Sequence, residues 1–135
     1  MKILLPDGWP RPKGYSNGIK TNAGKSVFVA GVVGWDKTEV FRTDDLVEQF
    51  RQALINTKEI MEEGGASPEQ MVRMTWYITD KKDYLSRLRE IGQAYRSVMG
   101  KNYPVMACVQ VVALMEDRAK FEMETTCVIE DEVFS

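Results

Sequence analysis

Two stretches near the end of the chain alternate in polarity with a period of two, which is the pattern of a β-strand with two different faces. In residues 105–112, one set of side chains is Val105, Ala107, Val109 and Val111, and the other is Met106, Cys108, Gln110 and Val112. In residues 120–127, the apolar set is Phe121, Met123, Thr125 and Cys127, and the polar set is Lys120, Glu122, Glu124 and Thr126. The sequence therefore predicts two strands that each turn one face to a core.

The connection between these strands, residues 114–119, is short enough to join neighbours in one sheet. We therefore expect Cys108, Gln110, Glu122 and Glu124 to lie on one shared face. Such a face could hold a binding or catalytic site. It could also be a solvated sheet surface, because half-exposed strands show the same alternation.

Length and charge limit the class of protein. The chain has 135 residues and a mass of 15.4 kDa, enough for one hydrophobic core, so we expect a single domain over residues 1–135. Apolar residues make up 44% of the chain and its formal net charge is −2, which favours a soluble globular protein and argues against nucleic acid as a partner. The sequence has no apolar segment of membrane-spanning length and no leader-like start, so we expect a cytoplasmic protein without a membrane partner.

The chain contains no histidine and two cysteines. Without histidine, the Ser-His-Asp and Cys-His pairs of nucleophilic catalysis are excluded, and so is a common metal ligand. Cys108 and Cys127 lie on opposite predicted faces of their strands, so we expect free thiols rather than a disulfide. We therefore expect no metal and no cofactor, and any catalysis has to use carboxylates, tyrosine, thiol, backbone groups or water.

The first 14 residues hold three of the five prolines, which predicts an extended arm, anchored by Trp9, rather than a helix or a central strand. Residues 19–22 and 26–33 have the composition of strands, and the short turn between them predicts a hairpin. Gly31 inside the second of these strands indicates a bulge or a close approach of another group.

Two amphipathic helices are predicted, at residues 45–63 and 80–100. Each begins at an aspartate that can cap it. Glycine follows the first helix directly and is the last residue of the second. Between them, the sequence predicts a single capped turn at residues 67–70 and a third strand at residues 72–79.

The predicted order is β-β-α-β-α-β-β, which corresponds to an α/β (α+β) fold with two helices packed on one face of a single sheet. The second face of that sheet would have no covering layer and would mix apolar with polar side chains. Burial between subunits is the expected solution for such a face, so the sequence favours a homo-oligomer.

Seven short motifs occur in the order and spacing of one known family. They are residues 14–18, 27–31, 50–54, 65–68, 72–80, 103–111 and 121–124, with the sequences GYSNG, VFVAG, FRQAL, GASP, VRMTWYITD, YPVMACVQV and FEME. With these motifs, the chain resembles the RidA/YjgF family of reactive intermediate imine deaminases, also described as L-PSP endoribonucleases.

The resemblance implies a chorismate-mutase-like fold that assembles as a homotrimer, with the sheets turned inward and a pocket at each subunit boundary. It also implies a small-molecule substrate, because deaminating members hydrolyse enamines or imines to ketones and ammonia without a metal or organic cofactor. In those members, a pocket arginine binds the substrate carboxylate with two hydrogen bonds.

This chain departs from the family at the arginine, because Met106 stands in its place. A thioether is a weak acceptor and cannot bind a carboxylate as a guanidinium does, so simple 2-imino acids are not the expected substrates. The chain therefore resembles the branches of the family that lack the arginine.

The resemblance assigns roles to the other pocket positions. Glu122 and Tyr15 are the candidate catalytic residues, Glu122 by orienting or deprotonating the attacking water and Tyr15 by donating a hydrogen bond to the ligand. The candidate substrate-binding residues are Met106, Cys108, Ala30 and Gly31. For each of these residues a purely structural role is also compatible with the sequence, and Cys108 has no histidine to generate a thiolate.

Two function classes are compatible with these residues. The first is a cofactor-free deaminase that acts on an enamine or imine recognised by shape and hydrogen bonds. The second is a trimer of the same fold that binds a small metabolite or a partner without turning it over. Ribonuclease activity is a weaker third alternative, because the isoelectric point is near 5.3 and the chain has neither histidine nor a basic stripe.

Overall fold

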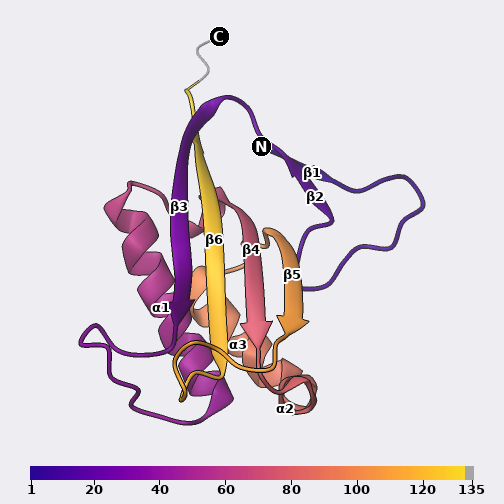
Figure 1. Cartoon of the computed structure of the whole chain (residues 1–135). Coiled ribbons are helices and arrows are strands. Elements are labelled where there is room, and N and C mark those ends of the chain that lie inside the picture. Colours follow the sequence, from indigo (N-terminus) through magenta and orange to yellow (C-terminus); the bar gives the residue numbers. More distant parts are fainter. Residues whose placement is uncertain (133–135) are drawn as a thin grey trace.

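The computed structural model describes residues 1–132 and is built around one four-stranded sheet (Figure 1). In the sheet the strands follow the order β3-β6-β4-β5. Their bounds are β3 (Gly24–Val33), β4 (Met71–Ile78), β5 (Val105–Gln110) and β6 (Phe121–Glu130). Strand β6 is antiparallel to both of its neighbours, whereas β4 and β5 are parallel.

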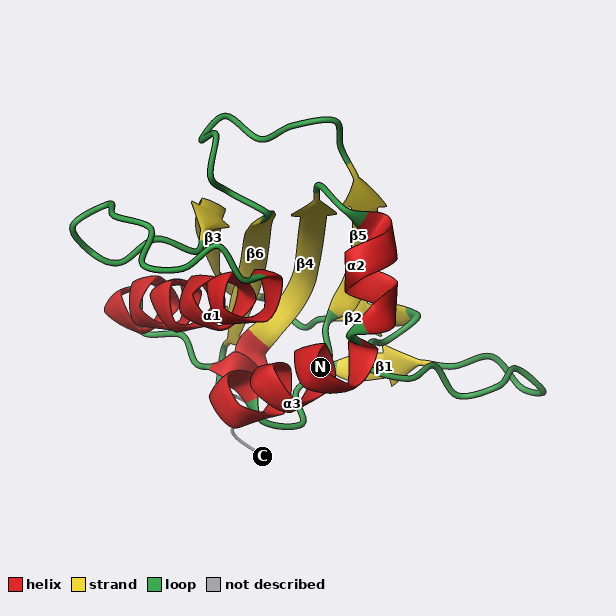
Figure 2. Ribbon diagram, turned by 90° about the horizontal axis from the view of Figure 1, so that it is seen from below, coloured by secondary structure: helices red, strands yellow, loops and turns green. Residues whose placement is uncertain are grey.

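The helices cover one face of this sheet. They are α1 (Leu46–Glu63), α2 (Lys81–Ser86) and α3 (Leu88–Met99), and a 3-10 turn, η1 (Pro68–Gln70), precedes β4. Figure 2 is turned by 90° from Figure 1 and shows α1 and α3 on one side of the sheet, α2 next to β5, and the connection from β5 to β6 on the other side. The predicted α/β fold is therefore confirmed. No helix within residues 1–132 is long and apolar enough to cross a membrane.

The core lies between the helices and the covered face. Phe50 of α1 packs on Phe121 of β6 and on Trp76 of β4, with ring centroids 4.7 Å and 4.9 Å from its own. Phe50 and Phe121 are completely buried. Because aromatic side chains bury large areas, this cluster supplies a major part of the hydrophobic stabilisation.

The ends of α1 follow the predicted signals. The Asp45 carboxylate accepts a hydrogen bond from the backbone N–H of Glu48 at 3.0 Å, which caps the first turn. After the last turn, Gly65 has a φ of +82°, a conformation that glycine adopts without the steric penalty of a side chain. The capped turn at Ser67 is also present, with the Gln70 side chain bonded back to the Ser67 N–H.

The hairpin predicted between residues 19–22 and 26–33 is wrong. Strand β2 (Gly18–Lys20) pairs with β1 (Lys2–Leu4) in a separate two-stranded sheet, which lies apart from the main sheet in Figure 1. The proline-rich segment between them forms the loop of this ribbon. Trp9 in that loop is 60% exposed, so its predicted role as an anchor is also wrong in the isolated chain.

The second predicted helix is divided into α2 and α3 at Arg87, whose φ and ψ of −126° and 25° are not helical. The break is held by ion pairs, because the Arg87 guanidinium binds Asp45 at 2.5 Å and Glu90 at 2.8 Å. Neither glycine nor proline marks the break, so no local sequence signal indicated it.

Candidate active site

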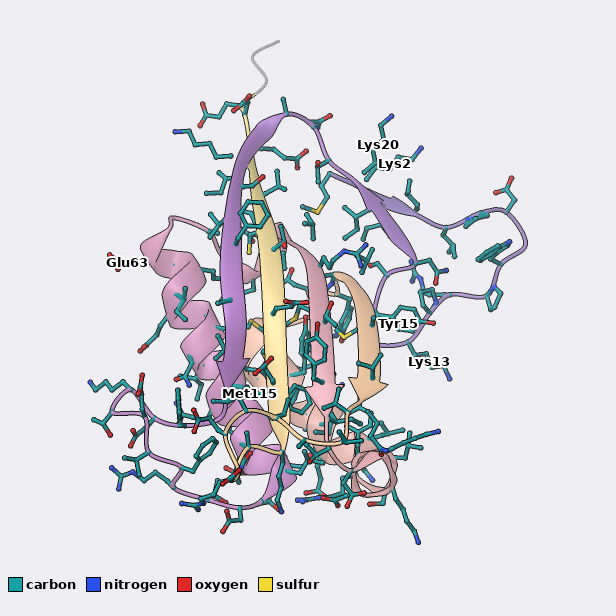
Figure 3. The ribbon with its side chains drawn as sticks, in the orientation of Figure 1. Lys2, Lys13, Tyr15, Lys20, Glu63 and Met115 are labelled. Atoms are coloured by element: carbon teal, nitrogen blue, oxygen red, sulfur yellow. The ribbon has the colours of Figure 1, made fainter. Side chains whose placement is uncertain are left out.

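The amino-terminal arm is fixed to the start of β5 by Ser16. The backbone N–H of Ser16 donates to the Pro104 carbonyl at 3.0 Å, and its hydroxyl donates to the Tyr103 carbonyl at 2.6 Å. Ser16 is buried and forms an isolated parallel bridge to Val105. This clamp places Tyr15 and Lys13 beside the outer edge of β5 (Figure 3).

A pocket of about 560 Å³ lies between the arm, β5 and the helices. It is lined by residues of the arm, of β4 and β5, of both helices α2 and α3, and of the segment before β5. They are Lys13, Gly14, Tyr15, Trp76, Tyr84, Leu88, Ile91, Gly92, Tyr95, Arg96, Tyr103, Met106 and Cys108. The structure thus brings together three of the predicted site residues, namely Tyr15, Met106 and Cys108.

One wall of the pocket is aromatic. Tyr95 stacks on Tyr103 with a centroid distance of 5.7 Å and an interplanar angle of 17°, and it also contacts Trp76 at 6.0 Å. The Tyr95 hydroxyl donates to the carbonyl of Asn102, which holds the ring in place. The wall therefore offers a rigid surface for an apolar or planar ligand group.

The phenols of Tyr84 and Tyr95 and the thiol of Cys108, all in the pocket wall, are neutral at physiological pH. Burial raises the pKa of the Tyr84 and Tyr95 phenols far above the usual value for tyrosine. Partial desolvation of the Cys108 thiol at the pocket raises its pKa, and a hydrogen bond with Tyr84 opposes this only in part. A neutral Cys108 is a poor nucleophile, which supports its role as a lining residue.

The predicted shared face of Cys108, Gln110, Glu122 and Glu124 is wrong, because the register with β4 places the even-numbered side chains of β5 and those of β6 on opposite faces of the sheet. Strand β4 lies between β5 and β6, so the two alternating strands are not neighbours. Cys108 pairs with Trp76, whose side chain is in the core, and the two therefore point to the helix-covered face. The even-numbered side chains of β5 thus belong to the covered face.

The glutamates belong to the opposite, open face. Glu122 and Glu124 are the register partners of Tyr77 and Thr75, which alternate with the buried residues of β4. Gln110, in contrast, accepts a hydrogen bond at 2.7 Å from the N–H of Lys81, the first residue of α2. The sheet itself therefore separates Glu122 from the pocket within one chain.

Cys108 and Cys127 are both free, as predicted, but not for the predicted reason. Cys127 alternates in phase with the buried Met123 and therefore points to the same covered face as Cys108. The two thiols are kept apart because β4 separates their strands. Burial raises the pKa of Cys127 to about 11.

Glu122 forms a small cluster with β3 on the open face. The pairing register of β3 and β6 shifts between Val29 and Val32, which confirms a bulge at Ala30 and Gly31. A Cβ at Gly31 would lie 2.8 Å from Oε2 of Glu122, so the close approach predicted for this glycine is also confirmed. Ala30 is exposed at the same bulge.

Tyr77 organises the rest of this face. Its hydroxyl donates to Glu124 at 2.8 Å, and this bond raises the pKa of the Tyr77 phenol. Phe28 on β3 lies on the same face, opposite Thr126, and is 76% exposed. The open face therefore combines carboxylates with an unpacked aromatic ring.

The pocket residues Lys13, Tyr84 and Arg96 were not predicted as site residues from the sequence, and neither was Ser16, which fixes the arm beside the pocket. Ser16 lies inside the GYSNG motif, but its partner carbonyls depend on the placement of the arm beside β5, which no local pattern contains. Arg96 lies outside the apolar stripe of its helix, so the amphipathic pattern did not select it. The sequence signal that could have indicated Arg96 was the glycine four residues before it, inside the predicted helix.

Comparison with known proteins identifies the family. The model of the family "Endoribonuclease L-PSP" matches residues 10–129. The chain belongs to the RidA/YjgF family. Among solved structures, the Rid family protein YyfB from Yersinia pestis superimposes with a TM-score of 0.84 at 25% identity, covering 95% of this chain and 98% of that one.

Two further relatives are known with a bound ligand or a named activity. E. coli TdcF with bound serine has a TM-score of 0.67 at 30% identity, covering 96% of this chain and all of TdcF. The 2-iminobutanoate/2-iminopropanoate deaminase of Salmonella typhimurium is 27% identical over 128 residues, which is 94% of this chain and 97% of that protein. TdcF is thus more similar to the chain in sequence, and YyfB is more similar in structure.

Proposed function

We propose that this protein is a cofactor-free deaminase that hydrolyses the C=N bond of a small imine, or of the enamine that tautomerises to it. Water adds to the imine carbon, the C–N bond then breaks, and the products are a ketone and ammonia. Family membership and the activity named for the Salmonella relative support this reaction. The observation that carries the proposal is the pocket in which the Ser16 clamp gathers Tyr15, Met106 and Cys108.

The attacking water needs a carboxylate or another base, and no carboxylate lines the pocket among the described residues. We assign this role to Glu122 from the open face of a second copy of the chain. A homotrimer in which open faces are buried between subunits would bring Glu122 of one subunit to the pocket of the next. The exposed Phe28 and the 44% exposed Val109 support burial of this face.

This assembly has a mass of about 46 kDa, three times the 15.4 kDa of the chain. Light scattering at micromolar concentration measures it directly. A particle of the mass of one chain would contradict the assignment of Glu122, because the two faces cannot meet within one molecule.

The substrate is larger than a simple 2-imino acid. Met106 offers no charge-assisted hydrogen bond to a carboxylate beside the C=N group, so we expect slow hydrolysis of 2-iminopropionate. Such a contact is worth roughly 2 to 5 kcal/mol, or about 30-fold to several thousand-fold in kcat/KM. Met106→Arg should therefore improve the use of 2-iminopropionate by a factor in this range.

The test is ammonia release from a panel of freshly generated imines and enamines of increasing size. Glu122→Gln should lower kcat by about 100-fold or more, because it keeps size and hydrogen bonding but removes the base. Glu124→Gln is the matched control on the same strand and face, and it should retain turnover. Absence of ammonia release from every substrate, in the wild type and in Met106→Arg, would refute the deaminase assignment.

A binding protein without turnover is the second candidate. It is favoured by one observation, namely that the pocket of a single chain has no carboxylate among the described residues and its thiol is neutral. This alternative predicts that ligands bind with the same affinity to the wild type and to Glu122→Gln, and that neither protein releases ammonia.

A further inference from the structure

A glycine and an arginine on one turn of α3 form a feature that packing does not explain. Gly92 lies inside the helix, where glycine is less favourable than alanine. A Cβ at Gly92 would lie 3.1 Å from Nη1 of Arg96 and 3.9 Å from its Cζ. The guanidinium therefore folds back over Gly92 and occupies the space that a side chain would fill. Both residues line the pocket.

Arg96 is not neutralised by its surroundings. The ion pairs formed by residues 1–132 do not include it. Arg87, one residue before the same helix, differs in this respect, because Asp45 and Glu90 bind its guanidinium. Arg96 thus keeps its hydrogen-bond donors free for a ligand.

The pocket as a whole is positive, although the chain has a net charge of −2. Its charged lining residues are the cations Lys13 and Arg96, and no aspartate or glutamate among the described residues joins them. The remaining lining is dominated by aromatic and aliphatic side chains, including the stacked Tyr95 and Tyr103. A ligand that fits this lining is an anion with an apolar or planar body.

The volume of the pocket agrees with such a ligand. At about 560 Å³ it lies within the range of roughly 300 to 1,000 Å³ found for pockets that hold drug-sized molecules. A three-carbon imino acid would leave most of this space unfilled and the aromatic wall without contact.

We propose that Arg96, positioned by Gly92, is the carboxylate anchor of this pocket, and that the substrate is a carboxylate with an aromatic or branched apolar body. That the anion is a substrate rests on the proposed deaminase function, but its binding does not depend on turnover. The carboxylate anchor of this protein thus lies on helix α3. Strand β5 has Met106 at the position where the resemblance places the family's arginine. Arg96 acts in specificity, and no bond to it forms or breaks in the reaction.

The experiment measures binding of phenylacetate and of its neutral counterpart phenylacetamide by isothermal titration calorimetry at low ionic strength. The wild type should bind phenylacetate about 10-fold or more tightly than phenylacetamide, because a charge-assisted hydrogen bond is lost with the amide. Arg96→Gln should lose this preference. Arg89→Gln, which removes an exposed arginine of the same helix outside the pocket, should retain it.

Gly92→Ala provides a second, independent variant. Alanine has the higher helix propensity, so the folded protein should be at least as stable, while the new Cβ forces the guanidinium to move. We expect phenylacetate to bind several-fold more weakly and the affinity for phenylacetamide to stay the same.

The outcomes separate this inference from the proposed function. Equal affinity of the wild type for acid and amide, or an unchanged preference in Arg96→Gln, overturns the anchor even if ammonia is released from imines. An Arg96-dependent preference without ammonia release from any substrate supports the anchor and refutes the deaminase.

Discussion

The two faces of the central sheet differ in what covers them and in which reactive groups they carry. The covered face has the helices, the aromatic core and, at its β5 edge, the pocket with Tyr15, Met106 and Cys108. The open face has Glu122, the Tyr77–Glu124 pair and the exposed Phe28. The residues that the family resemblance assigns to one site are thus divided by the sheet itself. A site that uses both sets needs two copies of the chain.

The largest expected effect tests the difference in packing between the faces. Phe121→Ala removes a completely buried ring in contact with Phe50 and Trp76, so we expect the free energy of unfolding to fall by about 3 to 5 kcal/mol. Phe28→Ala on the open face should change it by about 0.5 kcal/mol or less under conditions where the chain is monomeric. Urea titration of both variants gives the two values. Equal losses would show that the open face is packed within the single chain.

The second effect compares two thiols on the covered face. Cys108 is exposed at the pocket, whereas Cys127 is completely buried and has a pKa of about 11. We expect iodoacetamide to modify Cys108 at least about 100-fold faster than Cys127, because Cys127 reacts only after local or global opening. Mass spectrometry of peptides from a time course measures both rates, and the rate at Cys108 should increase with pH. Equal rates in the folded protein would contradict the placement of Cys127 beneath the helices.

Saturating phenylacetate gives a control within the same experiment. It should slow modification of Cys108, which lines the pocket, and leave Cys127 unchanged. Arg96→Gln should lose this protection at the same ligand concentration.

The smallest expected effect concerns Asp45, at the start of helix α1. Asp45 caps α1 and binds Arg87, and the hydrogen bond from Arg87 is the main cause that lowers its pKa from the ordinary value of 3.8. Because the folded-state pKa is the lower one, this stabilisation is complete above the unfolded pKa and is lost as the pH falls through the folded value. Asp45→Ala should cost about 1 kcal/mol at pH 7 and less at pH 2. Asp45→Asn should cost less, because asparagine still caps the helix.

Urea titrations at the two pH values provide these differences. A cost of Asp45→Ala that is larger at pH 2 than at pH 7 would contradict the ion pair with Arg87. The expected cost is modest because the carboxylate is partly exposed and its charge is screened by solvent.

The elements that were predicted from sequence are those specified by local signals. Helix α1 was predicted because Asp45, an apolar stripe and Gly65 agree on its ends, and β4 and β6 because their alternation matches a sheet with one buried face. The bulge at Gly31 was indicated by a single residue type. For these segments, propensity, pattern and tertiary packing favour the same structure.

The errors concern relations that no local pattern contains. Strand β5 carries apolar side chains on both faces, with Gln110 as the one polar residue, so alternation did not show which set faces the helices. Its adjacency to β4 follows from the crossover through α2 and α3. The arm pairs with itself and then clamps to β5 through Ser16, a contact over 87 residues of sequence. The division of the site residues between two faces followed from these relations and could not be derived before them.

The most direct test of the shared site is complementation between two inactive variants. Tyr15→Phe changes the pocket, and Glu122→Gln changes the open face. If each site takes its pocket from one subunit and Glu122 from the next, random mixed trimers contain intact sites in about one quarter of positions. Co-expressed and doubly tagged mixtures should therefore regain about a quarter of the wild-type rate of ammonia release, although both parents are inactive. Mixed trimers with no more activity than their parents would contradict a site built from two chains.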